Sequence, residues 1–323
     1  MTGSHQRSRR LLVALGVFLL VPGYLAWQWH FWWRRPPGKG AVAITVRPEA
    51  FSSVWTEREV LLVGLGDSVT AGFGASPGKS YFERLLKNPP DEFPALREIN
   101  LSKVLPRIRA TNLSVSGSTS LHHARTQVGK VPRQGSNVLG LVVFTTGGND
   151  LIHAYGKAPP VEGAMFGATA AQARPWRENF SRRLAEMVAT VTNRFPGGCH
   201  VFLANIYDPT DGLGDVEKAG LPPWPDGLLI HREYNQTIAD YVSRHGNVHL
   251  VDIHSAFMGH GIHCTQFWRS CYQRTDPHYW FHPNLEDPND RGYDALRRLF
   301  LNAICEVMAR PSSSGPEAPD KDG

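Results

Sequence analysis

Three short stretches of the sequence each place small polar residues directly after an apolar run. Ser68 lies in "VGLGDSVTAG", Gly117 in "NLSVSGSTS" and Asn149 in "TTGGND". A serine hydroxyl is a nucleophile once a neighbouring base takes its proton. A glycine N–H and an asparagine amide can donate hydrogen bonds to the oxyanion that then forms. These residue types together predict acyl transfer.

A serine at neutral pH needs a proton acceptor, and the chain offers several histidines toward its C-terminal side. Five of them lie between His254 and His282. We expect the base to be His282, which directly precedes Pro-Asn close to the last predicted helix. The alternative is His260, because the glycines on either side of it would let a loop deliver its ring. Asp276 or Asp287, or a main-chain carbonyl, would orient the imidazole.

Alternating apolar and amphipathic segments predict how these groups are positioned. Strand-like runs alternate with helix-like segments, which predicts a single domain with a parallel sheet covered by helices on both faces. Ligands of such sheets bind at the carboxyl ends of the strands, so Ser68, Gly117 and Asn149 should converge there. The predicted strands are residues 59–66, 108–115, 139–146, 200–207 and 247–254, and the predicted helices are residues 79–88, 174–195, 228–246 and 290–309.

The motifs resemble those of the SGNH (GDSL) hydrolases. "GDSVTAG", "NLSVSG" and "GGND" are similar to the first three blocks of that family and occur in the same order, and the resemblance spans residues 60–299. It implies a flavodoxin-like three-layer α/β/α sandwich with a parallel five-stranded sheet. It also implies that Ser68 is the nucleophile and that its own N–H, the Gly117 N–H and the Asn149 side chain form the oxyanion hole. We expect neither a cofactor nor a catalytic metal.

The fourth block departs from the family pattern. The family usually has Asp-x-x-His followed by Pro-Asn, whereas this chain has Asn284 at the aspartate position and Asp287 at the histidine position. The nearby "FHPN" supplies His282, which also precedes Pro-Asn. The choice between His282 and His260 therefore stays open at this point.

The sequence predicts a serine esterase that forms an acyl-enzyme on Ser68, with a small-molecule, glycan or lipid ester as substrate. Trp224, in the long stretch 208–227, is expected to shape the pocket. Two alternatives remain. One is a non-catalytic binding module on the same fold. The other is a metal-dependent hydrolase that uses the histidines and cysteines of residues 254–282, since nitrogen and sulfur ligands suit zinc.

The charge of the chain is concentrated near its N-terminus. The net charge is +5, yet residues 1–40 hold six basic side chains and no acidic one, so the remainder is close to neutral. This pattern excludes a nucleic-acid-binding surface on the body of the protein. The apolar stretch 11–33 ends in several tryptophans, which predicts a membrane anchor with the body outside the cytoplasm. A cleaved signal peptide, which would give a secreted protein, is the alternative.

We therefore expect three segments. Residues 1–40 form the N-terminal stub and anchor, residues 41–310 form the hydrolase domain, and residues 311–323 form a disordered tail without apolar side chains. In an oxidising compartment, Cys264 and Cys271 are close enough in sequence to form a disulfide, although four buried thiols are the alternative reading.

Overall fold

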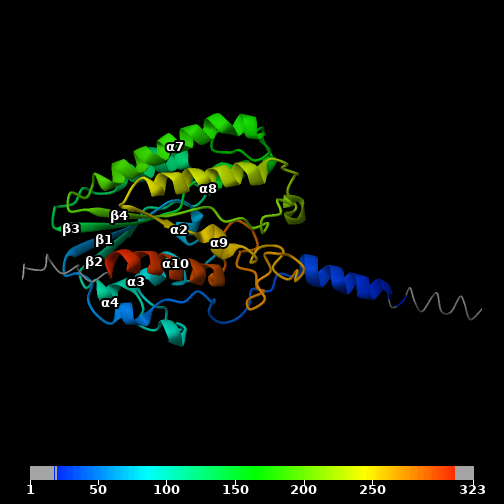
Figure 1. Ribbon diagram of the computed structural model, residues 1–323, viewed down its shortest axis with the longest axis horizontal. Coiled ribbons are helices and arrows are strands. Elements are labelled where there is room, and N and C mark those ends of the chain that lie inside the picture. Colours follow the sequence, from blue (N-terminus) through cyan, green and yellow to red (C-terminus); the bar gives the residue numbers. More distant parts are fainter. Residues whose placement is uncertain (1–17, 19, 310–323) are drawn as a thin grey trace, which may run out of the picture.

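The computed structural model describes residue 18 and residues 20–309. Its centre is a five-stranded parallel sheet with the strand order β2-β1-β3-β4-β5 (Figure 1). The predicted parallel α/β fold is therefore confirmed. The strands are β1 (Glu59–Leu65), β2 (Ile108–Asn112), β3 (Val138–Phe144), β4 (Cys199–Ala204) and β5 (Val248–Val251).

The composition of each strand explains its place in the sheet. In β1 and β3 almost every side chain is buried, because both faces of these central strands are covered by helices. β2 forms one edge and is largely exposed. The nearly continuous apolar runs of the sequence thus belong to the middle of the sheet, and the more polar run belongs to its edge.

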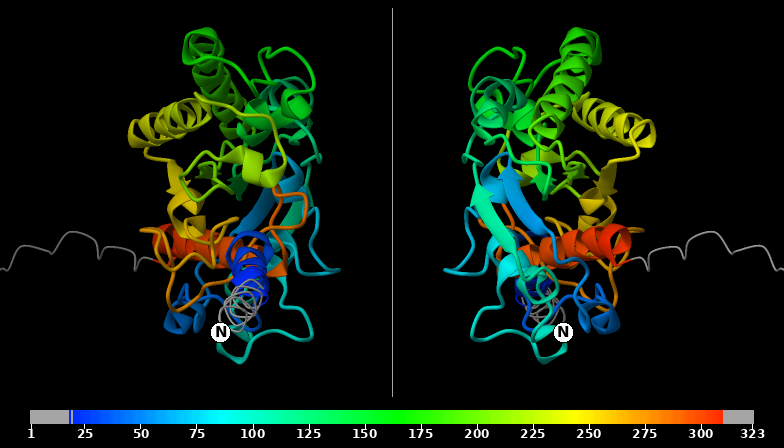
Figure 2. Two further views of the ribbon diagram at one scale, coloured as in Figure 1. Left: turned by 90° about the vertical axis from the view of Figure 1, so that its right-hand side faces the viewer. Right: turned by 90° about the vertical axis from the view of Figure 1, so that its left-hand side faces the viewer.

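Two layers of helices enclose the sheet (Figures 1 and 2). The long helices α7 and α8 cover one face, while α3, α4 and α10 lie on the other. On α7, Phe180, Leu184 and Met187 form the apolar stripe predicted from the sequence, and all three are buried. The helices are α2 (Ser68–Ala71), α3 (Tyr81–Leu86), α4 (Leu101–Val104), α5 (Ser120–His122), α6 (Gly148–Ile152), α7 (Ala170–Thr192), α8 (Gly227–Ser243), α9 (Ile253–Phe257) and α10 (Asp290–Met308).

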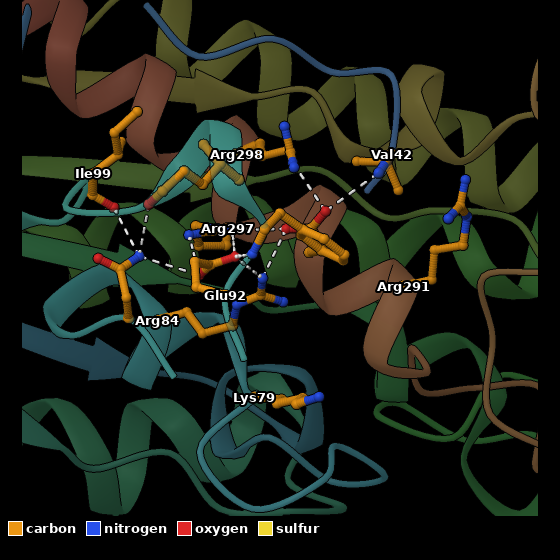
Figure 3. Close-up of polar contacts among 12 residues, drawn as sticks. Val42, Lys79, Arg84, Glu92, Ile99, Arg291, Arg297 and Arg298 are labelled. Carbon is orange, nitrogen blue, oxygen red and sulfur yellow. Dashed lines mark hydrogen bonds and ion pairs between the residues drawn. The ribbon is translucent and has the colours of Figure 1, made fainter. Parts of the chain in front are cut away.

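A buried cluster of charged side chains joins α3 and α10, which lie on the same face of the sheet (Figure 3). Arg297 on α10 binds Glu92 at 3.0 Å and Asp294 at 2.8 Å, and Arg84 on α3 binds the same two acids. Burial acts to raise the pKa of Asp294, yet the surrounding guanidinium groups hold that pKa below its ordinary value. The Val42 N–H also donates to Asp294, which ties the segment before β1 to α10.

A helix formed by residues 20–33 projects away from the domain (Figure 1). Only its end contacts the body: the Trp27 ring lies 5.7 Å from that of Trp268, and Phe31 packs edge-on against Phe267 and Trp268. Within residues 20–309, no helix has both the length and the apolar character needed to cross a bilayer. The beginning of the predicted anchor (residues 11–17 and 19) and the predicted tail 311–323 lie outside the described residues.

Cys264 and Cys271, which could have paired by their spacing, are not joined by a disulfide. All four cysteines are free thiols, and Cys264 is fully buried, which raises the pKa of its thiol to about 12. Cys264 thus packs as a small apolar side chain in the core next to the sheet.

Candidate active site

Ser68 is placed at the end of the central strand β1 by a tight turn. Gly66 in this turn has a φ of +127°, and a Cβ at this position would lie 2.2 Å from the Thr145 carbonyl oxygen. Only glycine fits so close to the neighbouring strand. The chain then starts α2, whose N-terminal cap is Asp67 and whose first residue is Ser68. The serine lines the large cavity at this end of the sheet.

The loops after β2 and β3 meet beside this turn. The Asn149 amide at the start of α6 donates a hydrogen bond of 3.0 Å to the Ser118 carbonyl. The Ser118 hydroxyl donates in turn to the Gly66 carbonyl at 3.0 Å. Gly117, directly before Ser118, is exposed and has a φ of +76°. The structure thus gathers the loops that carry Ser68, Gly117 and Asn149, and Ser68 and Asn149 line the same cavity.

Two buried side chains, neither of them predicted as a site residue, hold these loops in place. Gln127 bonds both the N–H and the carbonyl of Gly66, at 2.9 and 2.8 Å. His123 lies between the hydroxyls of Ser118 and Thr146, at 2.8 and 2.9 Å. Burial lowers the pKa of His123 to about 3, so this ring is neutral and serves as a hydrogen-bonding spacer. Their positions follow no local pattern that the sequence reveals.

The cavity in front of Ser68 has a volume of about 300 Å³ and a largely apolar wall. Its lining comes from the turn after β1, the segments after β3 and β4, and α8. Trp224 is part of this wall, as the sequence predicted, and its indole N–H donates to the Ala168 carbonyl at 2.8 Å. Other apolar lining residues are Leu151, Ile152, Phe166, Ile206, Leu221 and Leu228.

The fourth sequence block brings a carboxylate to Ser68. The Asp287 side chain lies close enough to Ser68 for the serine to influence its pKa, but no well-aligned hydrogen bond joins the two, and Asn284 Nδ2 donates to Asp287 Oδ2 at 2.7 Å. The other oxygen, Oδ1, is buried and has no well-aligned hydrogen bond among the described residues. Burial raises the pKa of Asp287, and the contacts from Ser68, Asn284 and the nearby His282 oppose this rise only in part.

Neither predicted histidine makes a recorded hydrogen bond to Ser68. The His282 ring packs edge-on against Phe73 at 5.8 Å and lies directly against Gly74, and its Nδ1 has no partner within the part of the chain that the structure describes. His260 stacks flat on Trp280 at 3.5 Å, and its Nδ1 contacts the His278 carbonyl. His260 does not line the cavity, and burial lowers its pKa to about 4.

The second predicted orienting acid, Asp276, belongs to a different set of contacts. Its carboxylate lies 2.6 Å from His278 Nδ1 and 2.8 Å from an Arg291 nitrogen. Because its contacts go to these two side chains, Asp276 reaches neither His282 nor Ser68 by a hydrogen bond.

A second carboxylate, Asp67, directly precedes Ser68, is buried and lines the same cavity. It accepts hydrogen bonds from the Thr145 hydroxyl at 2.8 Å and from the Val69 N–H at 3.2 Å. Burial is the main cause that raises the pKa of Asp67 to about 7, and the negative charge of Asp287 adds to the rise. Two acids of like charge therefore approach the turn that carries the serine.

The histidines and cysteines of residues 254–282 do not assemble into a metal site. Among the described residues, no group of three or more histidine, cysteine, aspartate or glutamate side chains is arranged to hold a metal ion. His263, for example, contacts Asp215 at 2.9 Å, while Cys264 is buried in the apolar core. The metal-dependent alternative has no candidate ligand set in this part of the chain.

Comparison with known families agrees with this geometry. The sequence model of the GDSL-like lipase/acylhydrolase family matches residues 65–295, more than half of the chain and the part that carries Ser68, Asn149 and Asp287. The chain belongs to this family. The resemblance seen in the sequence motifs is thereby confirmed, and the protein is an ester hydrolase of the GDSL type.

Several solved structures are similar to this GDSL-type hydrolase. An extracellular lipase from Streptomyces rimosus is 18% identical, with 76% of this chain and 99% of that one covered and a TM-score of 0.47. An acetylxylan esterase from Geobacillus stearothermophilus is 16% identical, with 77% and 96% covered and a TM-score of 0.48. Phospholipase A1 from Streptomyces albidoflavus is 20% identical, with 75% and 99% covered and a TM-score of 0.44. No curated protein sequence matches the chain.

Proposed function

We propose that this GDSL-type hydrolase cleaves a carboxylic ester through an acyl-enzyme on Ser68. The observation that carries the proposal is that the Ser68 hydroxyl and the Asn149 amide line one cavity, at the carboxyl ends of the central strands. One Asn149 amide hydrogen is held by the Ser118 carbonyl, which orients the side chain and leaves the second hydrogen for a substrate oxygen.

The proposed reaction has two halves. The Ser68 oxygen attacks the ester carbonyl while its proton moves to a base, and the carbonyl electron pair becomes an oxyanion. The N–H groups of Ser68 and Gly117 and the Asn149 amide stabilise this oxyanion. The intermediate collapses, the alcohol leaves with the proton, and the acyl group stays on Ser68. Water then repeats the sequence and releases the acid.

The cavity supports an ester whose acyl part is apolar. Its walls are mainly Leu, Ile, Phe and Trp side chains, and its volume of about 300 Å³ is at the lower end of small-molecule sites. An acyl chain of moderate length would bury its methylene groups there and place its carbonyl at Ser68. Small-molecule, glycan and lipid esters with such an acyl group all remain within the proposed substrate class.

A fluorophosphonate probe tests the function directly, since it reacts with an activated serine. The full chain should be labelled with one probe per molecule and should hydrolyse p-nitrophenyl butyrate, and Ser68→Ala should lose both properties. Activity that survives in Ser68→Ala, or that a chelator removes, would contradict the serine mechanism. A wild-type chain with neither labelling nor hydrolysis would instead indicate the non-catalytic binding module.

We further propose that the N-terminal segment holds the enzyme at a membrane. The helix of residues 20–33 exposes Tyr24, Leu25 and Trp29, and its end adjoins an aromatic collar that we define as Trp27, Phe31, Phe267 and Trp268. Aromatic side chains favour the interface between lipid and water, and Arg34 and Arg35 follow directly. The helix of residues 20–33 joins the body beside the orange segment that follows α9 (Figure 1).

A further inference from the structure

A buried acid next to Asn149 holds the segment that follows Gly117. This acid, Asp150, accepts two hydrogen bonds from Ser120: one from the main-chain N–H to Oδ2 at 3.1 Å, and one from the hydroxyl to Oδ1 at 2.9 Å. Asp150 and Ser120 are both completely buried. One carboxylate thus holds the main chain and the side chain of a residue that lies three positions after Gly117.

An arginine from α7 fixes the direction of these hydrogen bonds. Arg183 Nε lies 2.9 Å from the Ser120 hydroxyl oxygen, and a guanidinium group can only donate. The hydroxyl therefore accepts from Arg183 and directs its own hydrogen to Asp150. Arg183 is itself buried, and its Nη1 atom pairs with Glu162 at 2.7 Å. The result is a continuous series of polar contacts that runs from α7 through the start of α5 to α6.

The charges in this series allow the Asp150 carboxylate to accept both bonds. Burial raises the pKa of Asp150 to about 6, while the bonds from Ser120 and the positive charge of Arg183 oppose the rise. Above this pH the carboxylate is ionised, so both of its oxygens are acceptors. An asparagine at this position would offer only one acceptor oxygen, and its NH₂ group would face a donor.

Two cross-links therefore join the loops that carry the proposed oxyanion donors. The first is the bond of 3.0 Å from the Asn149 amide to the Ser118 carbonyl, and the second is the pair of bonds between Asp150 and Ser120. The loop is thus held on both sides of residue 119, directly after Gly117, whose φ is +76°. The donors of an oxyanion hole must lie about 3 Å from one oxygen atom. A single bond would let the loop pivot about Ser118, whereas the second cross-link removes this freedom.

We propose that Asp150 and Ser120 are positioning residues of the oxyanion hole, which keep the Gly117 N–H at the distance from the Asn149 amide that the tetrahedral intermediate requires. This inference rests on the proposed esterase function and names two residues for which the sequence predicted no role. Neither Asp150 nor Ser120 lines the cavity, so both act through the donors and not by touching the substrate.

The experiment compares Asp150→Asn, Ser120→Ala and Asp294→Asn with wild type in the full chain at pH 8. Each protein is assayed for kcat and KM with p-nitrophenyl butyrate and for the inhibition constant of butylboronic acid. The boronate bonds to the nucleophilic serine and becomes tetrahedral, so its affinity reports how well the donors surround the oxyanion position. Melting temperatures measure the loss of stability separately.

The expected pattern is a loss in the transition state without a loss in substrate binding. Asp150→Asn should lower kcat by about 10–100-fold and raise the inhibition constant by a similar factor, with KM within about threefold of wild type. Ser120→Ala keeps the main-chain bond to Asp150 and should show the same pattern with a smaller loss. The control Asp294→Asn alters a buried acid on α10, on the other face of the sheet, so it should lower the melting temperature but leave kcat and the inhibition constant unchanged.

The outcomes distinguish a positioning role from a purely structural one. If Asp150→Asn melts at a lower temperature but keeps the kcat and the boronate inhibition constant of wild type, the acid only stabilises the fold and the inference is wrong. If Asp150→Asn does not fold, Ser120→Ala decides the question, and values equal to those of wild type overturn the inference. A wild-type chain that neither hydrolyses the ester nor reacts with a fluorophosphonate would instead contradict the proposed function.

Discussion

The side chain of Asn149 and the main chain of Ser118 are joined by a hydrogen bond of 3.0 Å, which links the loops after β3 and β2. Because this bond fixes the amide, Asn149 needs no reorganisation when an oxyanion forms. Asn149→Ala should lower kcat by about 10²–10³-fold with little change in KM. Steady-state kinetics on p-nitrophenyl butyrate provide the measurement. The control is Asn302→Ala, since the Asn302 amide bonds the Thr45 carbonyl, and this variant should keep the kcat of wild type. A loss of kcat below threefold in Asn149→Ala would argue against the oxyanion role.

The cavity wall should set the preferred acyl length. Leu228 at the start of α8 lines the cavity, whereas its neighbour Leu229 is 41% exposed. Leu228→Trp should fill part of the cavity and lower kcat/KM for a hexanoate ester relative to an acetate ester by about tenfold or more, since each buried methylene is worth about 0.8 kcal/mol. Leu229→Trp should leave the ratio unchanged. If the ratio of kcat/KM for the hexanoate and acetate esters is the same in Leu228→Trp and Leu229→Trp, the acyl group does not bind in this cavity.

The buried Asp67 should make stability depend on pH in a defined direction. Its pKa is raised from 3.8 to about 7, so between these values the unfolded carboxyl has lost its proton while the folded one retains it. Stability from this group is therefore present below pH 4 and is lost as the pH rises toward 7, by up to about 1.4 kcal/mol per pH unit.

Asp67→Asn removes this titration while keeping an oxygen that can cap α2. Urea unfolding at pH 5 and pH 7 should show that the stability of wild type relative to the variant decreases at the higher pH. A relative stability that is constant, or that increases with pH, would contradict the raised pKa of Asp67.

The buried charge cluster should contribute strongly to stability. Arg297 is fully buried between Glu92 and Asp294, so Arg297→Met leaves two buried acids short of a partner. We expect the free energy of unfolding to fall by about 3–5 kcal/mol. The exposed pair Lys103–Glu98 is the matched comparison, and Lys103→Met should cost less than about 1 kcal/mol. If urea titrations give similar losses in the free energy of unfolding for Arg297→Met and Lys103→Met, the buried cluster does not stabilise the fold more than the exposed pair does.

The aromatic collar should promote binding to lipid surfaces. Phe267 and Trp268 are 64% and 41% exposed, and replacing both with alanine should weaken association of the full chain with phosphatidylglycerol-containing vesicles by about tenfold. Vesicle sedimentation measures the effect. Val161→Ala, which alters an exposed apolar residue outside the collar, is the control. If the double variant binds as wild type does, the collar does not contact the membrane.

Much of the fold was determined by local sequence patterns. The sequence runs predicted all five strands to within a few residues. The signal is strongest for β1 and β3, because strands buried on both faces must be almost wholly apolar. The helices predicted at residues 174–195 and 290–309 correspond to α7 and α10. The Gly-Asp-Ser turn also predicted Ser68 at a strand end, since a tight turn against a neighbouring strand demands glycine.

The surroundings of Ser68 were decided by tertiary structure. Residue 287 lies far along the chain in a segment of irregular loops, where no periodic pattern reports which side chain turns inward. His260 was a reasonable candidate by sequence, but its ring is occupied by stacking on Trp280. Asn284 donates to the Asp287 carboxylate at 2.7 Å, a contact that the sequence does not reveal. The sequence determined which groups stand at the ends of the strands. The packing of the loops determined which side chains approach those groups, because the path of a loop depends on contacts between distant residues.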